Sequence, residues 1–526
     1  MAPARAVTVF PGQDFHLNHA ETHVLRTTPV QRMGRLRQVG LGFIAWPTAE
    51  HTRLAHCIGT AYWAEQLLSG LGLQTNSGPG TKTSASMARM RQMEALLGPR
   101  LSLKLLIRLY AIVHDMCLLP LCHTLRFELG YFREPREIAK RLVFCIDRVR
   151  AELREAPFVT ENSRIEPDEI RHTLLHHLDL LECVLNADTV DAPGDWIAPS
   201  SIRADLMASI HHIAPFVDDL VAGTYSADIL DYAQRDTLGI GMPFMPDRRL
   251  IDWGEVFASR EPGDAAATSR DDRAEAVYRF GLSAATDGVQ VLTSLISLIR
   301  IRYEITERVL YHPQKCAADA LLDRALRTID AANASVSQAS GPFAIAGLLR
   351  LGDDEFVKVV ENEERLALGN GRNSTSAIDD LLARRLPLEV IRLDRRTGTG
   401  GLERHAAEFI KPAVRGRIER AICQDVEELS EHDIVFAPRP RHMQIKHADM
   451  LVEWEPGLPQ SLKDIASTRN IAREVLELDN RYTELWSVSV YLRVHKAHLF
   501  DAARSAAQRV LSDPARLAAL VSAAST

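Results

Sequence analysis

The chain has 526 residues, of which 46% are hydrophobic and 25% are charged. This balance is typical of folded globular proteins and excludes wholesale disorder. The length predicts two to four domains of roughly 100–200 residues each. The 62 basic and 69 acidic residues give a formal net charge of −7. That charge argues against a surface that coats nucleic acid, and nucleic acid is therefore not indicated as a partner.

No stretch of the sequence predicts a membrane span. Val291–Ile299 is one of the most apolar stretches, but Thr293, Ser294 and Ser297 interrupt it. It is also far shorter than the roughly 18 residues that a bilayer requires. The first five residues lack the charged start and long apolar stretch of a secretory signal. Seven cysteines, sparse and odd in number, suit a reducing compartment. We therefore expect a cytoplasmic protein without a membrane partner.

Helical periodicity dominates the chain as far as about residue 350. In Leu101–His114 apolar residues occupy most of the helical circumference, which predicts a central helix. Similar patterns predict helices at 57–69, 137–153, 168–184, 201–221, 286–311 and 316–331. Residues rich in glycine, proline, serine and threonine predict loops at 70–86, 187–200, 258–272, 367–376 and 396–401.

Strand-like alternation is scarce before residue 430. It then predicts strands at 433–436, 442–445, 450–454 and 486–492. The predicted fold class is mainly α, with a large helical core followed by a smaller α+β lobe. We place the two domains at residues 20–350 and 351–526.

Three segments carry side chains of the kinds that ligate metals. They are His51–His56, the pair His114–Asp115 at the end of the central helix, and Asp228. His123, with Glu128 five residues later, lies between the second and third segments. Imidazole together with carboxylate is a ligand set for Mn, Fe, Zn or Mg. Each segment alone is a weak signal, because a histidine on an apolar helix is more often an ordinary core residue.

Further residues around these segments form a recognisable series. The series comprises Thr28–Arg32, Arg35–Gly40, Trp46–Ala49, His51–His56, His114–His123, Asp228–Gly239 and Glu307–His312, with weaker similarity in 435–492. Asp228–Asp236 reads Asp-x-x-Asp-Tyr-x-x-Arg-Asp, and His51–His56 reads His-x-Arg-x-x-His. In this combination the chain resembles the HD-domain deoxynucleoside triphosphate triphosphohydrolases, which include bacterial dGTPases and the mammalian sterile-alpha-motif HD protein. The resemblance covers most of residues 20–495.

The resemblance implies an HD-domain helical core at 20–350, a divalent metal (Mn, Fe, Mg or Zn) and a homo-oligomer. The implied metal ligands are His56, His114, Asp115 and Asp228. The implied substrate-binding residues are Gln38 facing the deoxyribose, Val39 crowding the 2′ position, Arg53 on phosphate, Asp236 on the 3′-hydroxyl, and Tyr232 and Tyr311 lining the sugar and base pocket.

Two positions depart from the family pattern. Arg126 stands three residues after His123, where the family usually has an acidic residue, and Leu118 stands where many members have a second histidine. Glu128 is then the remaining candidate to orient His123, and we assign both residues to catalysis. The guanidinium of Arg126 is expected to lower the pKa of His123. Alternatively, it binds a substrate phosphate, points to solvent, or pairs with Glu128 or Glu134.

The leading hypothesis is a metal-dependent nucleotide phosphohydrolase that converts dNTPs into deoxynucleosides and tripolyphosphate. Water would attack the α-phosphorus in line, and His123 would protonate the leaving 5′-oxygen. One alternative is an HD phosphohydrolase that acts on another phosphate ester. The other is a nucleotide sensor in which Arg126 weakens turnover and the C-terminal lobe reports occupancy of the pocket.

Overall fold

The computed structural model describes residues 3–72, 84–132, 135–158, 166–187, 199, 201–202, 204–259, 276–284, 288–369, 375–394, 402–439, 450–455, 458–468 and 473–522. Helices dominate these residues and the sheets are small, which confirms the mainly-α prediction with a smaller α+β lobe. The predicted strand at 442–445 and parts of the predicted loops lie outside the described residues. Among the helices described, none is long and apolar enough to cross a membrane.

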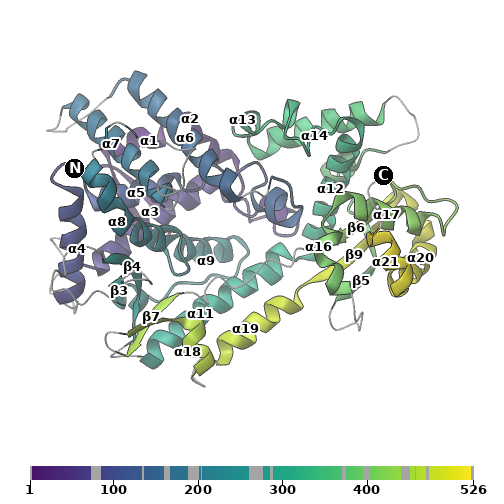
Figure 1. The fold of residues 1–526 in the computed structure, drawn as a ribbon. Coiled ribbons are helices and arrows are strands. Elements are labelled where there is room, and N and C mark those ends of the chain that lie inside the picture. Colours follow the sequence, from purple (N-terminus) through teal and green to yellow (C-terminus); the bar gives the residue numbers. More distant parts are fainter. Residues whose placement is uncertain are drawn as a thin grey trace.

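The centre of the larger lobe is α5 (Leu103–Val113), as the apolar pattern predicts. Every residue of α5 except Lys104 is buried, and its first turn is capped by Ser102, which accepts from the Leu105 amide at 3.3 Å. α3 (Arg53–Gly70) packs against both α5 and α9 (Ala227–Gly239) (Figure 1). These three helices therefore bring residues far apart in the sequence into one core.

The other helical predictions before residue 350 are confirmed, with ends that differ by a few residues. The pattern at 286–311 divides into α11 and a π-helical turn, Thr306–Leu310. The remaining helices of this part are α1 (His19–Leu25), α2 (Thr28–Arg32), α4 (Ser84–Leu97), α6 (Pro135–Glu155), α7 (Pro167–Leu185), α8 (Ala204–Ala222), α10 (Arg249–Asp252), α11 (Gly288–Ile305), α12 (Pro313–Asn333) and α13 (Ile345–Leu348).

The described strands form three small sheets. An antiparallel hairpin joins β1 (Pro3–Phe10) and β2 (Gln13–Asn18). The second sheet has the order β3-β4-β7-β8, with β4 parallel to β7, and comprises β3 (Gly254–Ser259), β4 (Val277–Ser283), β7 (Leu451–Glu455) and β8 (Leu458–Ser461). The third is antiparallel, has the order β5-β9-β6, and comprises β5 (Leu388–Asp394), β6 (Ile434–Pro438) and β9 (Ser487–Leu492).

The predicted strands at 433–436, 450–454 and 486–492 correspond to β6, β7 and β9. β1–β5 precede residue 430 and were not predicted. β4 shows why. Four of its seven residues are buried, and three of these, Phe280–Leu282, are consecutive in the sequence. A strand covered on both faces loses the alternation on which a sequence-based prediction depends.

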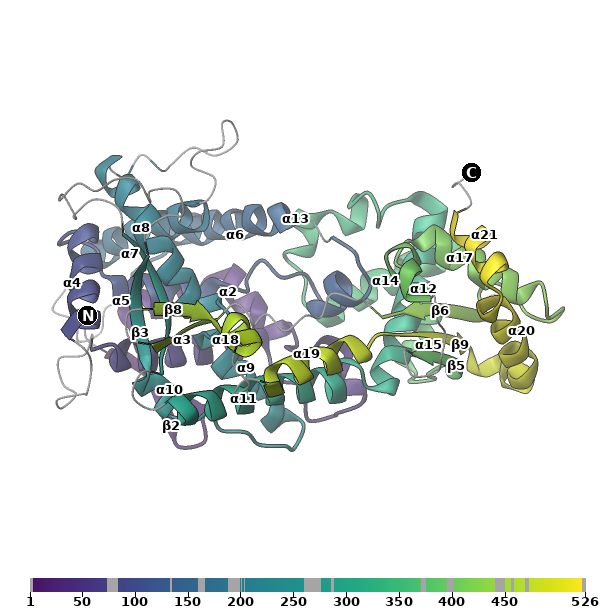
Figure 2. The same ribbon diagram turned by 60° about the horizontal axis from the view of Figure 1, so that its bottom comes forward.

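Two hydrophobic clusters organise the C-terminal part. The smaller cluster is built by β5, β6 and β9 together with α17, α20 and α21, at the right of Figure 1. Residues of 353–381 and 450–482 instead join the larger cluster, and α19 packs along α11 (Figure 2). The predicted division at residue 350 stays a prediction. The helices here are α14 (Asp353–Leu368), α15 (Ala377–Leu382), α16 (Ala406–Phe409), α17 (Pro412–Cys423), α18 (Leu462–Thr468), α19 (Arg473–Glu484), α20 (Phe500–Ser512) and α21 (Pro514–Ser522).

A buried ion cluster joins α12 to the smaller lobe. Glu419 in α17 is fully buried, and it accepts from Arg324 Nη2 at 2.7 Å and Arg327 Nη2 at 2.8 Å. It also accepts from the amide of Phe436 in β6 at 2.8 Å. Burial alone would raise the pKa of Glu419, but the two guanidiniums outweigh it and lower the pKa to about 2. The carboxylate therefore stays charged and fixes α12 against α17 and β6.

We expect Glu419→Ala to destabilise the protein by about 3–5 kcal/mol, because it leaves two buried guanidiniums without their shared partner. The matched control is Glu431→Ala, which removes a half-exposed partner of Arg420 at 3.2 Å. That loss costs less than about 1 kcal/mol. Urea unfolding followed by circular dichroism measures both changes, and equal effects would contradict the assignment.

Candidate active site

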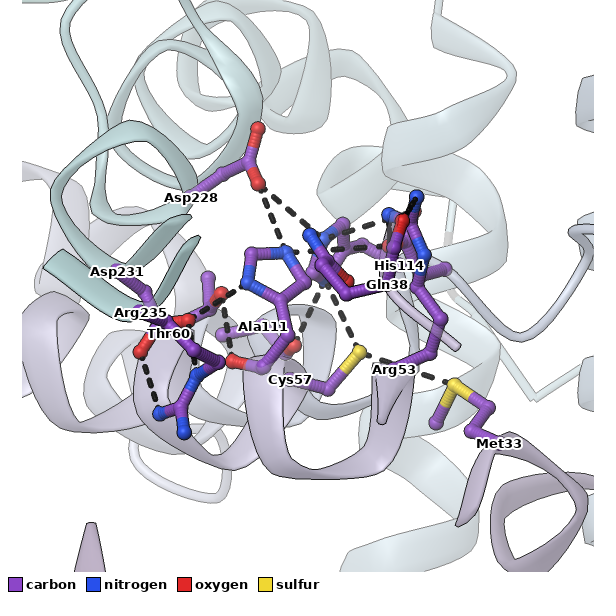
Figure 3. A network of polar contacts seen from close by, with 12 residues as sticks. Met33, Gln38, Arg53, Cys57, Thr60, Ala111, His114, Asp228, Asp231 and Arg235 are labelled. Carbon is purple, nitrogen blue, oxygen red and sulfur yellow. Dashed lines mark hydrogen bonds and ion pairs between the residues drawn. The ribbon is translucent and has the colours of Figure 1, made fainter. Parts of the chain in front are cut away.

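Three of the four predicted metal ligands converge on one point. His56 comes from α3, His114 directly follows α5, and Asp228 lies in the first turn of α9. His56 Nε2 lies 2.9 Å from Asp228 Oδ1, and His114 Nε2 lies 3.9 Å from the same oxygen. Ligand atoms from the three residues all lie within 4.8 Å of one another (Figure 3). The packing of α3, α5 and α9 thus builds the predicted cluster.

The opposite nitrogen of each imidazole is held by a hydrogen bond. His56 Nδ1 lies 2.7 Å from Asp231 Oδ2, and His114 Nδ1 lies 2.8 Å from the carbonyl oxygen of Ala111. An Nδ1–H that donates to these oxygens leaves the Nε2 lone pair directed at the cluster. His114 Nε2 is buried without a hydrogen-bond partner among the described residues, and His56 Nε2 lies within hydrogen-bond distance of the Asp228 carboxylate alone. This donor set fits a divalent cation.

Asp231 is a functional residue that sequence reasoning did not assign. It is fully buried, and Arg235 binds both of its oxygens at 2.8 Å (Figure 3). Gly59 in α3 permits this approach, because a Cβ there would lie 1.7 Å from Asp231 Oδ1. The only signal in the sequence is its place in the Asp-x-x-Asp-Tyr pattern. Asp231 orients His56 and does not itself face the cluster.

Asp115, the fourth predicted ligand, is shared with an arginine. Its Oδ1 and Oδ2 lie 3.8 Å from His114 Nε2 and His56 Nε2, respectively. Arg53 Nη1 binds Oδ2 at 2.6 Å, and Arg53 Nη2 donates to the carbonyl oxygen of Gln38 at 2.8 Å. Burial raises the pKa of Asp115, but the charge of Arg53 outweighs it and holds that pKa well below its usual range. The structure therefore places Arg53, the predicted phosphate ligand, against Asp115 and the Gln38 segment.

The two carboxylates of α9 create a strongly negative environment around His56. Burial lowers the pKa of His56, but hydrogen bonds with Asp228 and Asp231 outweigh it and raise that pKa to about 10. Asp228 is the most open of the cluster, with 30% of its side chain exposed. The site therefore attracts positive charge at His56 Nε2.

A second group, Cys57 with His114 and Asp115, also has ligand atoms within 4.8 Å of one another. It is less suited to a cation. Cys57 Sγ lies 3.9 Å from His114 Nδ1, the nitrogen that Ala111 already engages. Burial also raises the pKa of the Cys57 thiol well above its ordinary value. Only a thiolate is an effective ligand, so the group with His56 and Asp228 is favoured.

The predicted sugar-binding residues flank this cluster. Gln38 is 5% exposed, and its Oε1 is buried without a partner among the described residues. Val39 is equally buried in a small apolar cluster with Val309, and Tyr232 packs against that cluster. The hydroxyl of Tyr232 is likewise buried and unpartnered within the described structure, and burial raises its pKa. Gln38 Oε1 and the Tyr232 hydroxyl, both without a partner in the described structure, are polar groups near an apolar cluster. This combination suits the binding of a sugar ring.

His51 holds Asp236, the predicted reader of the 3′-hydroxyl. His51 Nε2 lies 2.7 Å from Asp236 Oδ1. Gly239 makes room for this ring, because a Cβ there would lie 2.9 Å from His51 Nδ1. Sequence reasoning noted His51 only as part of the His-x-Arg-x-x-His pattern. Its role here is to orient the Asp236 carboxylate.

Arg302 in α11 is a second residue that the sequence analysis missed. It hydrogen-bonds to Tyr482. Burial lowers its pKa, but nearby Tyr232, Tyr482 and Asp228 outweigh it and raise that pKa. This cation therefore interacts electrostatically with the candidate ligand Asp228. In the sequence it is one of several charged residues in a long helical pattern, which is typical of a solvated helix face.

His123 follows a strained turn and begins a π-helical segment. Leu121 and Cys122 have φ of 55° and 47°, and Thr124–Glu128 form the π-helical turn. Burial first, and then the charge of Arg53, lower the pKa of His123 to about 3. Arg126 lowers that pKa as expected, but it is the smallest of the resolved causes. His123 is therefore neutral at pH 7 mainly because it is buried.

Glu128 has a different partner from the His123 that the sequence suggested. Its carboxylate pairs with Lys315 Nζ in α12, and Lys315, which is fully buried, also lies 2.8 Å from Asp319. Glu128 and Tyr311 line a common cavity of about 50 Å³ at the smaller lobe. Arg439 covers the ring of Tyr311 at 4.7 Å, and burial raises the pKa of Tyr311. The structure thus brings Glu128 and Tyr311 together in a cavity that none of the metal-ligand candidates lines.

We expect His56→Ala and Asp228→Ala each to reduce bound metal to trace levels, because the remaining side chains hold a divalent ion poorly. Cys57→Ala is the matched control and should keep full metal content, because it removes only the less suited group. Elemental analysis after dialysis against Mn²⁺ measures all three variants. Loss of metal in Cys57→Ala with full retention in Asp228→Ala would reverse the assignment.

Comparison with known proteins supports the fold. No family model matches the chain. A stretch of 55 residues is 31% identical to an uncharacterised protein of Methanocaldococcus jannaschii. The stretch covers 10% of this chain and 12% of that protein. The chain therefore spans only a small part of that curated relative. A crystal structure of a phosphohydrolase from Bacteroides thetaiotaomicron is similar over 93% of this chain and 100% of that chain, with a TM-score of 0.55 and 13% identity. The chain thus shares the fold of a solved phosphohydrolase.

Proposed function

We propose that the chain is a metal-dependent phosphohydrolase that converts deoxynucleoside triphosphates into deoxynucleosides and tripolyphosphate. The observation that carries this proposal is the convergence of the buried Nε2 atoms of His56 and His114 on the Asp228 carboxylate. The fold shared with the Bacteroides phosphohydrolase supports the reaction class. The homo-oligomer and the cytoplasmic location remain predictions, and the residues described here test neither.

The cation would supply polarisation of a phosphoryl oxygen and activation of water. The protein's own residues would hold the parts in place. Asp231 and the Ala111 carbonyl fix the imidazole tautomers, and Arg53 fixes Asp115. Arg302 adds positive charge that interacts electrostatically with Asp228. A triphosphate is strongly anionic, and guanidinium groups beside a cation are suited to bind it.

The substrate sugar would lie between Gln38, Val39 and Asp236. Val39 is buried in an apolar cluster, so a 2′-hydroxyl placed against it would lose hydration without gaining a partner. Asp236 keeps one oxygen free of His51 and is suited to accept from a 3′-hydroxyl. This arrangement favours 2′-deoxynucleotides.

The pKa of His123 is relevant to the alternative hypothesis of a nucleotide sensor. With its pKa lowered to about 3, it carries almost no proton at pH 7 and is a poor general acid. A bound triphosphate would oppose this effect, because nearby negative charge favours the imidazolium form. The sensor hypothesis therefore rests on the pKa that His123 has with substrate bound.

We expect the protein to hydrolyse dNTPs about 5- to 150-fold more efficiently than the matching NTPs, because an unsatisfied buried hydroxyl costs ~1–3 kcal/mol. A panel of four dNTPs and four NTPs with Mn²⁺, Fe²⁺, Mg²⁺ or Zn²⁺ tests this, with products separated by chromatography. Tripolyphosphate as the inorganic product identifies the reaction. Equal rates on all four pairs would contradict the sugar pocket, and turnover of another phosphate ester alone would favour the alternative enzyme.

We expect Arg126→Glu to change kcat by less than about fivefold, or about 1 kcal/mol, because burial and Arg53 lower the pKa of His123 more than Arg126 does. Measuring kcat from pH 5 to pH 9, with metal content as a control, checks this. A much larger gain would support the weakened-sensor hypothesis. A large rise in KM would instead indicate that Arg126 binds phosphate.

A further inference from the structure

Two segments of the candidate active site meet at one buried carboxylate. Asp353, the first residue of α14, is fully buried. Its Oδ1 accepts from the amide of Leu121 at 2.6 Å, and its Oδ2 accepts from the amide of Arg37 at 2.8 Å. Leu121 is 232 residues away in the sequence and Arg37 is 316 away. Asp353 therefore bridges two chain segments that share no regular secondary structure.

Both amides belong to the functional segments. Arg37 directly precedes Gln38 and Val39, and Leu121 lies two residues before His123. Leu121 has a φ of 55°, in a turn where its N–H is not part of a helix. A buried backbone N–H requires an acceptor. Asp353 supplies that acceptor to the sugar-facing segment and to the His123 turn at the same time.

The start of α14 is itself fixed to the same two segments. Gly352 packs so closely on Arg35 that a Cβ would lie 2.6 Å from Arg35 Cβ. Arg32, which is 2% exposed, donates to the Leu351 carbonyl at 2.7 Å and to the Leu118 carbonyl at 2.9 Å. The positions of α14, the Arg32–Gln38 segment and the turn after Asp115 therefore depend on one another.

The Gln38–Gly40 segment and the His123 turn also lie directly against each other, without Asp353 between them. Gly40, with a φ of 54°, lies so close to the His123 turn that a Cβ there would be 2.7 Å from Thr124 Oγ1 and 2.9 Å from the Leu121 carbonyl oxygen. The absence of a side chain at Gly40 therefore lets the Gln38–Gly40 segment lie close against the His123 turn. Asp353 holds the two at a fixed separation.

We infer that Asp353 is a positioning residue, which sets the distance between the sugar-facing residues Gln38 and Val39 and the proton-transfer residue His123. This inference rests on the proposed function. The described contacts of Asp353 include none of the four predicted metal ligands. It therefore acts on catalysis through the backbone of the two segments and makes no described contact with the metal-ligand candidates.

Asp353→Asn tests the inference, because asparagine keeps the shape but has one acceptor oxygen and turns an N–H group toward the other amide. We expect unchanged metal content, a loss of about tenfold in kcat/KM on the best dNTP, and a fall of at least about fivefold in the dNTP-to-NTP ratio. The matched control is Asp354→Asn in the same helical turn. Asp354 is 80% exposed and pairs only with the Arg37 side chain among the contacts described, so both parameters should stay unchanged.

Hydrogen exchange provides a readout that does not depend on activity. In Asp353→Asn, peptides that cover 36–41 and 118–124 should exchange at least about tenfold faster, while α5 keeps its protection. Faster exchange confined to α14, or an unchanged dNTP-to-NTP ratio in an active enzyme, would overturn the inference. If the wild-type protein hydrolyses no nucleotide, the proposed function fails, and the exchange of these two peptides alone decides whether Asp353 holds them.

Discussion

The candidate centre depends on one constraint, which is that two buried imidazoles direct their Nε2 atoms at the same point. Each imidazole can do so only if its Nδ1–H has a partner, and the structure supplies Asp231 for His56 and the Ala111 carbonyl for His114. The requirement extends into the helix packing. α3 carries Gly59 where α9 brings Asp231 close, so the helix contact and the tautomer of His56 have one cause. Without that contact the cluster would be two ordinary core histidines.

For the same reason, α3, α5 and α9 alone do not determine the geometry of the candidate centre. The turn after Asp115 has positive φ at Leu121 and Cys122, and the Leu121 amide has its acceptor in a distant part of the chain. Arg32 and Asp353 bind this turn from the beginning and the middle of the chain. Glu128, a few residues farther on, is bound by Lys315 of α12, which the Glu419 cluster fixes to the smaller lobe. Residues beyond 350 therefore contribute to the geometry of a site whose ligands all lie before 230.

The sequence predicted the helical core and the grouping of the candidate ligands better than it predicted the supporting residues. Short sequence motifs contain His56, His114, Asp115 and Asp228. Such motifs can be recognised from neighbouring residues alone. Asp353 and Arg302 carry no such signal, because each acts on a segment far away in the chain. Glu128 shows the same limit, since proximity in the sequence suggested His123 as its partner and the fold supplied Lys315 from 187 residues away. β4 was missed because burial on both faces removes the alternation that marks a strand.

Arg126 departs from the family pattern, and the size of its effect on the pKa of His123 decides how this departure is interpreted. A guanidinium three residues from His123 does lower the pKa of that imidazole, as electrostatics predicts. Burial and Arg53 lower it more, and both belong to the architecture of the site. The low pKa of His123 therefore follows from the way the pocket is enclosed, and an acidic residue in place of Arg126 would leave most of the effect intact. The proposed triphosphate would bring several negative charges close to His123 and would favour its imidazolium form, which would couple the protonation of His123 to substrate binding.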